Sequence, residues 1–455
     1  MKKSHLKFNV RRLTTCTAIV LAGMLASCSN DDVENKEPEQ PVVSEGNTVS
    51  LKLISGALQA GRVERVTETK SSLNKKERLE YVGTIKPVEE EREKLNWSAT
   101  AVAFNADGTK AYVTWHSNMQ AENPATAWGG AVDVINIPLE LENTAYTDGI
   151  LKFNHVLYTP KYLFLGSTSA TDAGVVGRME LSNDGLSASV DVIGFPGVSV
   201  NAVAQNTEGN LVAVSGYKGT YGTFEPEAKA QPYYYGDKTE NQPRENVVTT
   251  LLPYDENFGG KYVTTDEEGE VYVLFNTESA NITKIGGKTV DLGVKMLSAV
   301  KVAETYDPIT KEWVASTATH DYYGKHVFAV KHDTAYVACG KNGLVVYDLK
   351  NEKRLCEDEN LLKVKTTGVC VDGDYVYLST EIGLQVYNWV NGVFHRYAFE
   401  VEKYENGLPV SDKSPAAGTD ERHSPNFVAV SKTGYIYVAY GQSGVRVYKF
   451  REVEE

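Results

Sequence analysis

A strand-turn-strand pattern occurs three times near the C-terminus, as TAYVACGKNGLVVYDL at 334–349, DYVYLSTEIGLQVYNW at 374–389 and GYIYVAYGQSGVRVYKF at 434–450. In each copy an alternating β-branched and aromatic run leads into a polar turn that ends in Gly, and a second alternating run follows. A unit of this size cannot bury both of its faces alone, so it must stack against its neighbours. The repeat therefore predicts a β-propeller or a solenoid.

Earlier and more divergent copies bring the total to seven, with about 54 residues for each of the six intervals between Tyr112 and Tyr437. Their first two strands are predicted at TAVAFNADGTKAYVTW (100–115), YLFLGSTS (162–169), NAVAQNTEGNLVAVSG (201–216), YVTTDEEGEVYVLFN (262–276), HVFAVKHDTAYVACG (326–340), TGVCVDGDYVYLST (367–380) and NFVAVSKTGYIYVAY (426–440). We expect an all-β fold, a seven-bladed β-propeller.

The two ends of the repeat region complement each other. The last copy lacks room for a fourth strand, because only a few residues follow Phe450. Residues 78–85 (RLEYVGTI) form an alternating run that belongs to no copy. We expect this run to complete the last blade as its outer strand and so to close the ring.

The N-terminus is typical of a bacterial lipoprotein. A basic start and an apolar run predict a signal peptide at 1–27, and Leu25-Ala26-Ser27-Cys28 resembles a lipobox with Cys28 as the lipidated residue. An ordinary signal peptide with a chance Cys is the alternative. Residues 28–45 are predicted to be a flexible acidic tether, and 46–455 a single propeller domain.

The acidic pair Asp31-Asp32 resembles a surface-export signal of outer-membrane lipoproteins, so we expect a lipid-anchored protein that faces the cell exterior. A solvated linker that carries no export signal is the alternative. Without residues 1–27 the chain has 41 basic and 60 acidic residues, a net charge of −19, which argues against nucleic acid as a partner.

The sequence contains no metal-ligand or cofactor motif, so we expect neither a metal nor a cofactor. Cys339, Cys356 and Cys370 are predicted to be buried free thiols, although a Cys356–Cys370 bridge is the alternative. No nucleophile motif occurs either. Distant blades can still bring two carboxylates together, which leaves an enzyme open but disfavoured.

We expect a ligand to bind on the propeller face where the second-to-third-strand loops meet the loops that enter each first strand. Flat side chains with polar tips suit carbohydrate, aromatic or corrin-like ligands. The candidate residues are Trp97, Trp115, His116, Trp128, Asn201, Tyr217, Tyr322, Tyr323, Lys325, His423 and Tyr440, and the entry loops also contribute Lys261, His326 and Asn426. A simple cap over the channel is the alternative role for Trp115 and Trp128, and a structural role is expected for His326.

A second insertion, 217–260, is rich in tyrosine and proline and is too long for a hairpin loop. It is interpreted as a lid or a surface for a partner protein, or else as a decorated blade edge.

The copies between 326 and 450 resemble LVIVD-type repeats of bacterial cell-surface β-propellers and are related in style to YncE-like propellers. Residues 100–300 match less well. The resemblance implies a seven-bladed ring and a surface location, and it says little about the ligand. Our first hypothesis is a non-catalytic lipoprotein that captures a nutrient (glycan, corrinoid or similar) for an outer-membrane transporter. An envelope interaction scaffold and a polysaccharide hydrolase or lyase are the alternatives.

Overall fold

The computed structural model divides the chain into two units, Met1–Val42 and Val43–Glu455, and every described residue lies in the second. The expected signal peptide, Cys28 and the tether to residue 45 lie outside the described residues. No helix among the described residues is long and apolar enough to cross a membrane. The described segments are 48–65, 79–88, 96–118, 129–148, 151–169, 173–182, 185–216, 220–228, 248–251, 259–296, 303–307, 312–316, 326–340, 342–356, 365–380, 383–390, 393–399, 403–405, 408–410 and 423–450.

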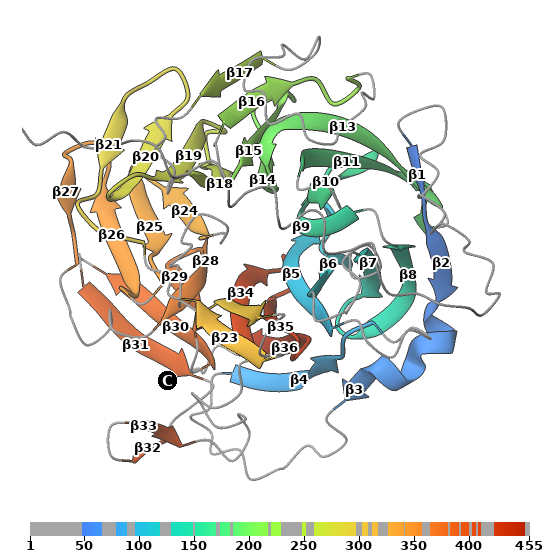
Figure 1. The fold of residues 1–455 in the computed structure, drawn as a ribbon. Coiled ribbons are helices and arrows are strands. Elements are labelled where there is room, and N and C mark those ends of the chain that lie inside the picture. The colour runs from blue at the N-terminus through green and yellow to red at the C-terminus, as the bar shows by residue number, and fades with distance from the viewer. Residues whose placement is uncertain are drawn as a thin grey trace, which may run out of the picture. The chain divides into compact units, whose positions relative to one another are not determined.

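The described part of the chain is almost entirely β, and its strands form antiparallel groups of four consecutive neighbours (Figure 1). We name each group after its first strand. The β5 group contains β5 (Asn96–Phe104), β6 (Lys110–Asn118), β7 (Gly129–Asn136) and β8 (Glu140–Asp148). The β9 group contains β9 (Leu151–Tyr158), β10 (Tyr162–Ser169), β11 (Ala173–Ser182) and β13 (Ser189–Val198), with β12 (Gly185–Leu186) paired to β11.

The middle of the chain repeats this arrangement. The β14 group contains β14 (Val200–Gln205), β15 (Leu211–Ser215), β16 (Thr220–Phe224) and β17 (Val248–Leu251). The β18 group contains β18 (Gly259–Thr265), β19 (Val271–Asn276), β20 (Ala280–Lys284) and β21 (Thr289–Asp291). The β24 group contains β24 (Phe328–Lys331), β25 (Thr334–Ala338), β26 (Leu344–Asp348) and β27 (Lys353–Arg354).

The C-terminal groups follow the same order. The β28 group contains β28 (Thr366–Asp372), β29 (Tyr375–Thr380), β30 (Gly383–Val390) and β31 (Val393–Phe399). The β34 group contains β34 (His423–Val430), β35 (Tyr435–Gly441) and β36 (Val445–Phe450), and its fourth strand is β4 (Leu79–Ile85). Two further hairpins occur along the chain between groups. β22 (Ala303–Asp307) pairs with β23 (Glu312–Ser316) before the β24 group, and β32 (Lys403–Glu405) pairs with β33 (Leu408–Val410) before the β34 group.

The predicted strand pairs agree with these groups except in the β9 group. There the segment 162–169 is the second strand alone, and the first strand, β9, was not predicted. The turn between the two strands contains Thr159-Pro160 and no Gly, so it lacks the turn signal that marks five of the other copies.

The first strands lie side by side around a common centre, which gives the described domain a propeller-like architecture (Figure 1). Contacts run from β5 to β9, β14, β18, β24, β28 and β34 in turn, and β34 also contacts β5. A polar side chain near the start of several first strands donates to a backbone carbonyl near the start of the next. These bonds are Thr100 to Phe153 O (2.9 Å), Asn154 to Val200 O (3.2 Å), Asn201 to Gly260 O (2.9 Å) and Asn426 to Ala99 O (2.7 Å).

These bonds connect the N-terminal ends of adjacent first strands, so the first strands all run in the same direction around the centre. We call the end at which they begin, and at which the second strands finish, the entry end.

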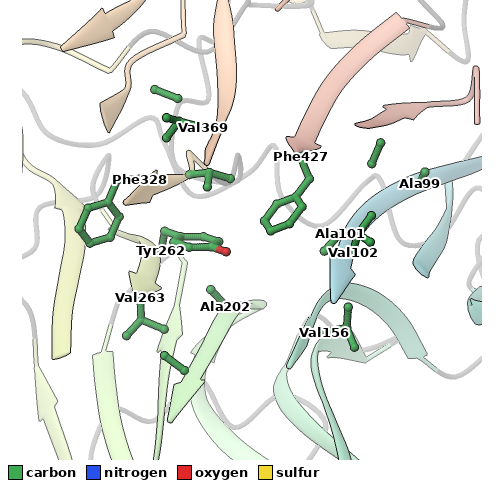
Figure 2. Packing of buried hydrophobic residues seen from close by; sticks show 14 of the residues in the cluster. Ala99, Ala101, Val102, Val156, Ala202, Tyr262, Val263, Phe328, Val369 and Phe427 are labelled. Atoms are coloured by element: carbon green, nitrogen blue, oxygen red, sulfur yellow. The ribbon is translucent and has the colours of Figure 1, made fainter. Parts of the chain in front are cut away.

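The next residue along each first strand packs at the centre. His155, Tyr262 and Phe427 occupy this position on β9, β18 and β34, and the His155 Nε2 lies 3.0 Å from the Tyr262 hydroxyl. The rings of Phe427 and Tyr262 have their centroids 6.4 Å apart (Figure 2). The equivalent residues of the other first strands are small: Ala101, Ala202, Val327 and Gly368. The small residues between the large ones leave room for the three rings to pack against one another at the centre.

The segment before β5 runs along the outer edges of three groups. β1 (Thr48–Ser50) pairs with β13, β2 (Lys52–Ser55) pairs with β8, and β3 (Val63–Arg65) pairs with β4. A short 3-10 helix, η1 (Gly56–Arg62), separates β2 from β3 and contacts β8. The sequence predicted only the last strand of this segment. The structure adds three more strands that cover otherwise unpaired edges.

Candidate functional site

Trp115 is a core residue and not part of a loop. β6 continues to Asn118, so the expected loop at 115–130 starts later than predicted. The side chain of Trp115 is fully buried, and its indole N–H donates to Asp133 Oδ2 at 2.8 Å. Our interpretation of Trp115 as a ligand-binding residue of the loop face is therefore wrong.

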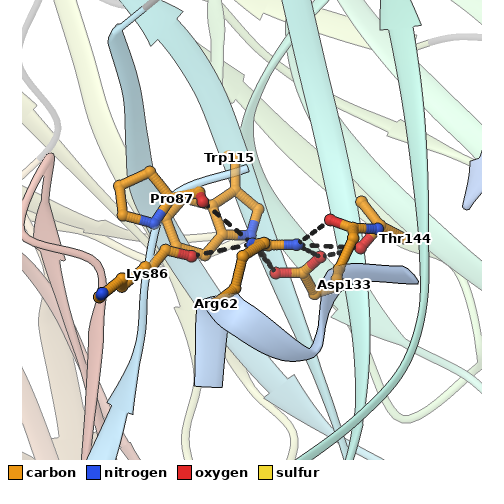
Figure 3. Close-up of polar contacts among 7 residues, drawn as sticks. Arg62, Lys86, Pro87, Trp115, Asp133 and Thr144 are labelled. Carbon is orange, nitrogen blue, oxygen red and sulfur yellow. Dashed lines mark hydrogen bonds and ion pairs between the residues drawn. The ribbon is translucent and has the colours of Figure 1, made fainter. Parts of the chain in front are cut away.

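Arg62 explains why Trp115 is buried. Its guanidinium lies 5.4 Å from the Trp115 ring and donates to both oxygens of Asp133, at 3.0 and 2.6 Å (Figure 3). It also donates to Gln59 Oε1 at 2.6 Å and, through Nε, to the carbonyls of Lys86 and Pro87. Both charged side chains are fully buried. This ion pair anchors the N-terminal segment to the β5 group.

Two other predicted aromatic residues are also buried. Trp97 packs its ring against Gly129, where an added Cβ would come within 2.9 Å of the indole. Tyr440 is buried on β35, and the Arg446 guanidinium lies 5.0 Å from its ring. These rings are not exposed, so the expectation that they stack on a ligand is wrong for both residues. They were predicted to be exposed because their strands extend further toward the entry end than the turn signals indicate.

His116 and Asn201, two of the predicted residues, are joined by one hydrogen-bond network. His116 Nδ1 lies 3.3 Å from Asn154 Oδ1, and Asn154 Nδ2 donates to Ser199 Oγ at 3.0 Å. Ser199 in turn donates to Asn201 Oδ1 at 3.2 Å, and Thr168 donates to Ser199 at 2.7 Å. The network crosses from the β5 group to the β14 group. It holds the entry ends of adjacent groups together.

Asn154, Thr168 and Ser199 were not predicted from the sequence. A signal for Asn154 was present, because Asn154, Asn201 and Asn426 each stand two residues before an apolar residue of their first strand, in NHV, NAV and NFV. An alignment of the seven predicted copies on this residue would have marked it.

Several predicted residues cannot be placed. Trp128, Tyr217, Tyr322, Tyr323, Lys325 and most of the 217–260 insertion lie outside the described residues. His423 is the first residue of β34, and only its backbone is described.

A positively charged cluster lies at the entry end of the β18, β24 and β28 groups. Lys261 and His326 are fully buried, with exposed fractions of 0% and 1%. His326 Nδ1 donates to the Ala338 carbonyl at 2.9 Å, which leaves the lone pair on Nε2. Burial, and after it the charge of Lys261, lowers the pKa of His326 to about 3, and Lys365 contributes in the same direction. His326 is therefore neutral at pH 7.

Buried polar atoms without a hydrogen-bond partner also gather at the entry end. Unpartnered groups at the opposite end or beside Arg62 are Asn143 Oδ1, Asn388 Oδ1 and Gln59 Nε2. Those at the entry end are Trp97 Nε1, Thr147 Oγ1, Asn276 Oδ1, Thr367 Oγ1 and Ser379 Oγ. Leaving such a group unpaired costs about 1–3 kcal/mol.

Cys339, Cys356 and Cys370 are free, so the Cys356–Cys370 bridge that we considered is not formed. Burial raises the pKa of Cys339 and of Cys370 to about 12 each, which keeps both thiols protonated. Among the described residues no group of three or more His, Cys, Asp or Glu side chains could hold a metal ion.

No protein-family model matches the chain, and no curated protein matches it. Solved structures of similar shape include a chain of a mitotic checkpoint complex, with 9% identity, a TM-score of 0.49 and coverage of 94% of this chain and 100% of that one. The computationally designed Ika8 protein is 10% identical with a TM-score of 0.39, covering 81% and 99% of the two chains. At these TM-scores neither likeness carries an argument about function.

Proposed function

We propose that this chain is a lipid-anchored β-propeller of the outer membrane that binds a nutrient ligand at the entry end without catalysis, and that it faces the cell exterior. Four unpartnered polar atoms at the entry end, Thr147 Oγ1, Asn276 Oδ1, Thr367 Oγ1 and Ser379 Oγ, carry the proposal. A polar ligand supplies the partners that these atoms lack in the free chain. A glycan, a corrinoid or a similar nutrient has the required donors and acceptors, and transfer to an outer-membrane transporter would follow binding.

The proposal includes a closed ring of seven blades. Support comes from the contact of β34 with β5 and from the hydrogen bond that Asn426 donates to the Ala99 carbonyl at 2.7 Å. Further support comes from the pairing of β4 with β36, which runs from Ile85 opposite Val445 to Leu79 opposite Phe450. A fourth strand donated by the N-terminal segment ties the two ends of the repeat region together.

Binding without catalysis agrees with the protonation states at the entry end. A general acid or base works best when its pKa lies near the ambient pH. The pKa of His326 is lowered to about 3 and that of Cys339 is raised to about 12. Neither group exchanges a proton at neutral pH, so both act as fixed hydrogen-bonding or apolar groups.

A thermal-shift screen tests the binding proposal. The full-length chain in detergent is mixed with glycans, corrinoids, haem and amino acids, and its unfolding midpoint is measured. A ligand at 100 times its dissociation constant stabilises the folded state by about 2.7 kcal/mol, which raises the midpoint measurably. The hit is then repeated with Thr367→Val, which should reduce the shift, and with the exposed control Lys353→Gln, which should not. A screen without any shift would contradict the proposal.

A further inference from the structure

The short helix η1 turns its polar side chains inward and its apolar ones outward. A 3-10 helix has three residues per turn, so positions three apart share one face. The buried positions are Gly56, Gln59 and Arg62, and the exposed positions are Ala57, Leu58, Ala60 and Gly61. A helix on the surface of a globular domain normally faces its apolar side toward the core. The reversed arrangement of η1 therefore calls for a partner outside the chain.

η1 is held in this orientation from both of its ends. At its C-terminal end the buried Arg62 guanidinium is bound to Asp133 and to Gln59 Oε1. At its N-terminal end a Cβ added to Gly56 would lie 1.8 Å from the Leu141 carbonyl oxygen, so the backbone is pressed against β8 (Figure 1). Leu58 cannot turn into the core without breaking the buried ion pair.

The outward face of η1 is apolar and carries no charge. Leu58 is 82% exposed, which is the largest value among the exposed large hydrophobic side chains of the described residues. Leu53, on the adjoining strand β2, is 49% exposed. The sequence from residue 48 to residue 63 contains no Asp or Glu, although the whole chain has a net charge of −14. An exposed apolar surface of this kind marks a contact with a membrane or with another protein.

The size and position of this face favour a lipid surface. A stable protein interface takes about 20–30 residues from each side, far more than the exposed face of η1 offers. A membrane contact that supplements a lipid anchor needs only a few inserted apolar side chains. About 20 residues separate Cys28 from the first described residue, Thr48. A flexible chain of that length spans about 25 Å, so an anchor at Cys28 would keep η1 within reach of the bilayer.

We propose that η1 docks on the lipid surface to which the chain is anchored, with Leu58 inserted among the lipid chains. This inference rests on the lipid anchor of the proposed function and adds a second membrane contact to it. Because η1 is fixed to β8, docking holds the outer edge of the β5 group at the membrane. The propeller is then oriented on the bilayer instead of moving freely at the end of its tether.

The test places a fluorophore beside Leu58 and measures its contact with lipid. Ala60→Cys is labelled with an environment-sensitive dye, and the lipidated chain is reconstituted into phosphatidylcholine vesicles with and without nitroxide-labelled lipid. The raised pKa of the Cys339 and Cys370 thiols slows their labelling, so the new exposed thiol reacts first. The control label is Val393→Cys, at a 54% exposed apolar residue of β31.

We expect the nitroxide lipid to quench the dye at position 60 and not the dye at position 393. Leu58→Asp should lower the ratio of docked to undocked chain by about tenfold or more, because a charge replaces the inserted side chain. Val393→Asp should leave the quenching at position 60 unchanged. High salt should not reduce it either, since the contact is apolar. Equal quenching at the two labels, or quenching at position 60 that Leu58→Asp does not reduce, would overturn the inference.

Two further measurements separate this inference from its alternatives. Flotation of the chain with vesicles tests the anchor alone: a chain that does not float removes both the anchor and the inference. A chain that floats without quenching at position 60 keeps its anchor, and only the docking of η1 fails. Light scattering of the chain in detergent tests self-association, and a dimer that Leu58→Asp dissociates would assign η1 to a second copy and overturn the membrane contact.

Discussion

Two buried polar regions of the domain, the Arg62 site and the entry end, differ in how completely their polar groups are hydrogen-bonded. Arg62 is paired to Asp133 through two hydrogen bonds and reaches four further oxygen acceptors, on Gln59, Thr144, Lys86 and Pro87. The positive charges of Lys261 and Lys365 both lower the pKa of His326. At the entry end, Asn276 Oδ1, Thr367 Oγ1 and Ser379 Oγ have no hydrogen-bond partner. At the Arg62 site the chain itself supplies the partners of the buried charges. At the entry end several buried polar atoms have no hydrogen-bond partner.

This difference separates a structural site from a binding site. A buried charge is tolerated when its neighbours supply the partners that water has lost. The chain meets this condition at Arg62 with its own residues. At the entry end several polar atoms are unpaired, which lowers the free energy of unfolding of the chain without ligand. Changes at Arg62 should therefore lower stability, whereas changes at the unpartnered groups of the entry end should lower affinity.

Arg62→Leu should have the largest effect on stability, because it leaves Asp133 charged, buried and without its partner. We expect the free energy of unfolding to fall by about 3–5 kcal/mol, measured by chemical denaturation. The control is Lys288→Leu, which breaks the exposed Lys288–Glu352 pair and should cost less than about 1 kcal/mol. Equal losses for the two variants would show that the buried pair does not anchor the N-terminal segment.

His326 should give the stability a pH dependence. Its pKa is about 3 in the folded chain and 6.5 for a free imidazole, so the unfolded chain binds a proton first as the pH falls. Stability from this group is complete above about pH 7 and declines toward pH 3. We expect a loss of about 2 kcal/mol between pH 7 and pH 5, and His326→Asn should remove that part of the slope. An unchanged slope in the variant would mean that His326 is not held neutral.

The sequence predicted the repeated strand pairs because each copy must alternate its residues to pack between neighbours. It also predicted the strand at 78–85, which the structure pairs with β36. It did not predict β1, β2 or β3, because short edge strands carry too few residues for an alternating pattern.

The candidate site was harder to predict than the fold. The sequence predicted a loop from Trp115, but β6 continues to Asn118. The neighbours of Trp115 in sequence do not reveal the Arg62–Asp133 pair with which its indole is hydrogen-bonded. Arg62 and Asp133 are far apart along the chain, so only the folded structure brings them together. Lys261 and His326 were expected on entry loops, but Lys261 lies within β18 and both side chains are buried. Their mutual proximity comes from adjacent first strands, which a single sequence does not show.

The docking of β4 can be tested at two glycines with similar backbone conformations. Gly444 and Gly434 have φ of 87° and 79°, so Ala at either position is strained by about 1 kcal/mol. A Cβ on Gly444 would lie 2.3 Å from the Ile85 carbonyl oxygen, whereas a Cβ on Gly434 would meet nothing within 4 Å. We expect Gly444→Ala to cost at least about 1 kcal/mol more than Gly434→Ala in chemical denaturation. Equal costs would mean that β4 does not press against this turn.

Ser379→Ala should have the smallest effect on stability and is the most direct test of the contrast between the two regions. The Ser379 hydroxyl is fully buried without a partner, whereas Ser167, equally buried on the equivalent strand of the β9 group, donates to the Leu165 carbonyl at 3.0 Å. Removing a hydrogen-bonded hydroxyl destabilises the fold because a hydrogen bond is lost. Removing an unpaired hydroxyl loses no hydrogen bond and relieves the cost of burying it.

We therefore expect Ser167→Ala to lower the free energy of unfolding by about 1 kcal/mol, and Ser379→Ala to leave it unchanged or to raise it by up to about 1 kcal/mol. Affinity for the ligand should show the reverse order, with a loss for Ser379→Ala and none for Ser167→Ala. Denaturation curves and calorimetric titrations of both variants measure the two quantities. If Ser379→Ala destabilises the chain as much as Ser167→Ala, the hydroxyl has a partner within the fold and the entry end is as complete as the Arg62 site.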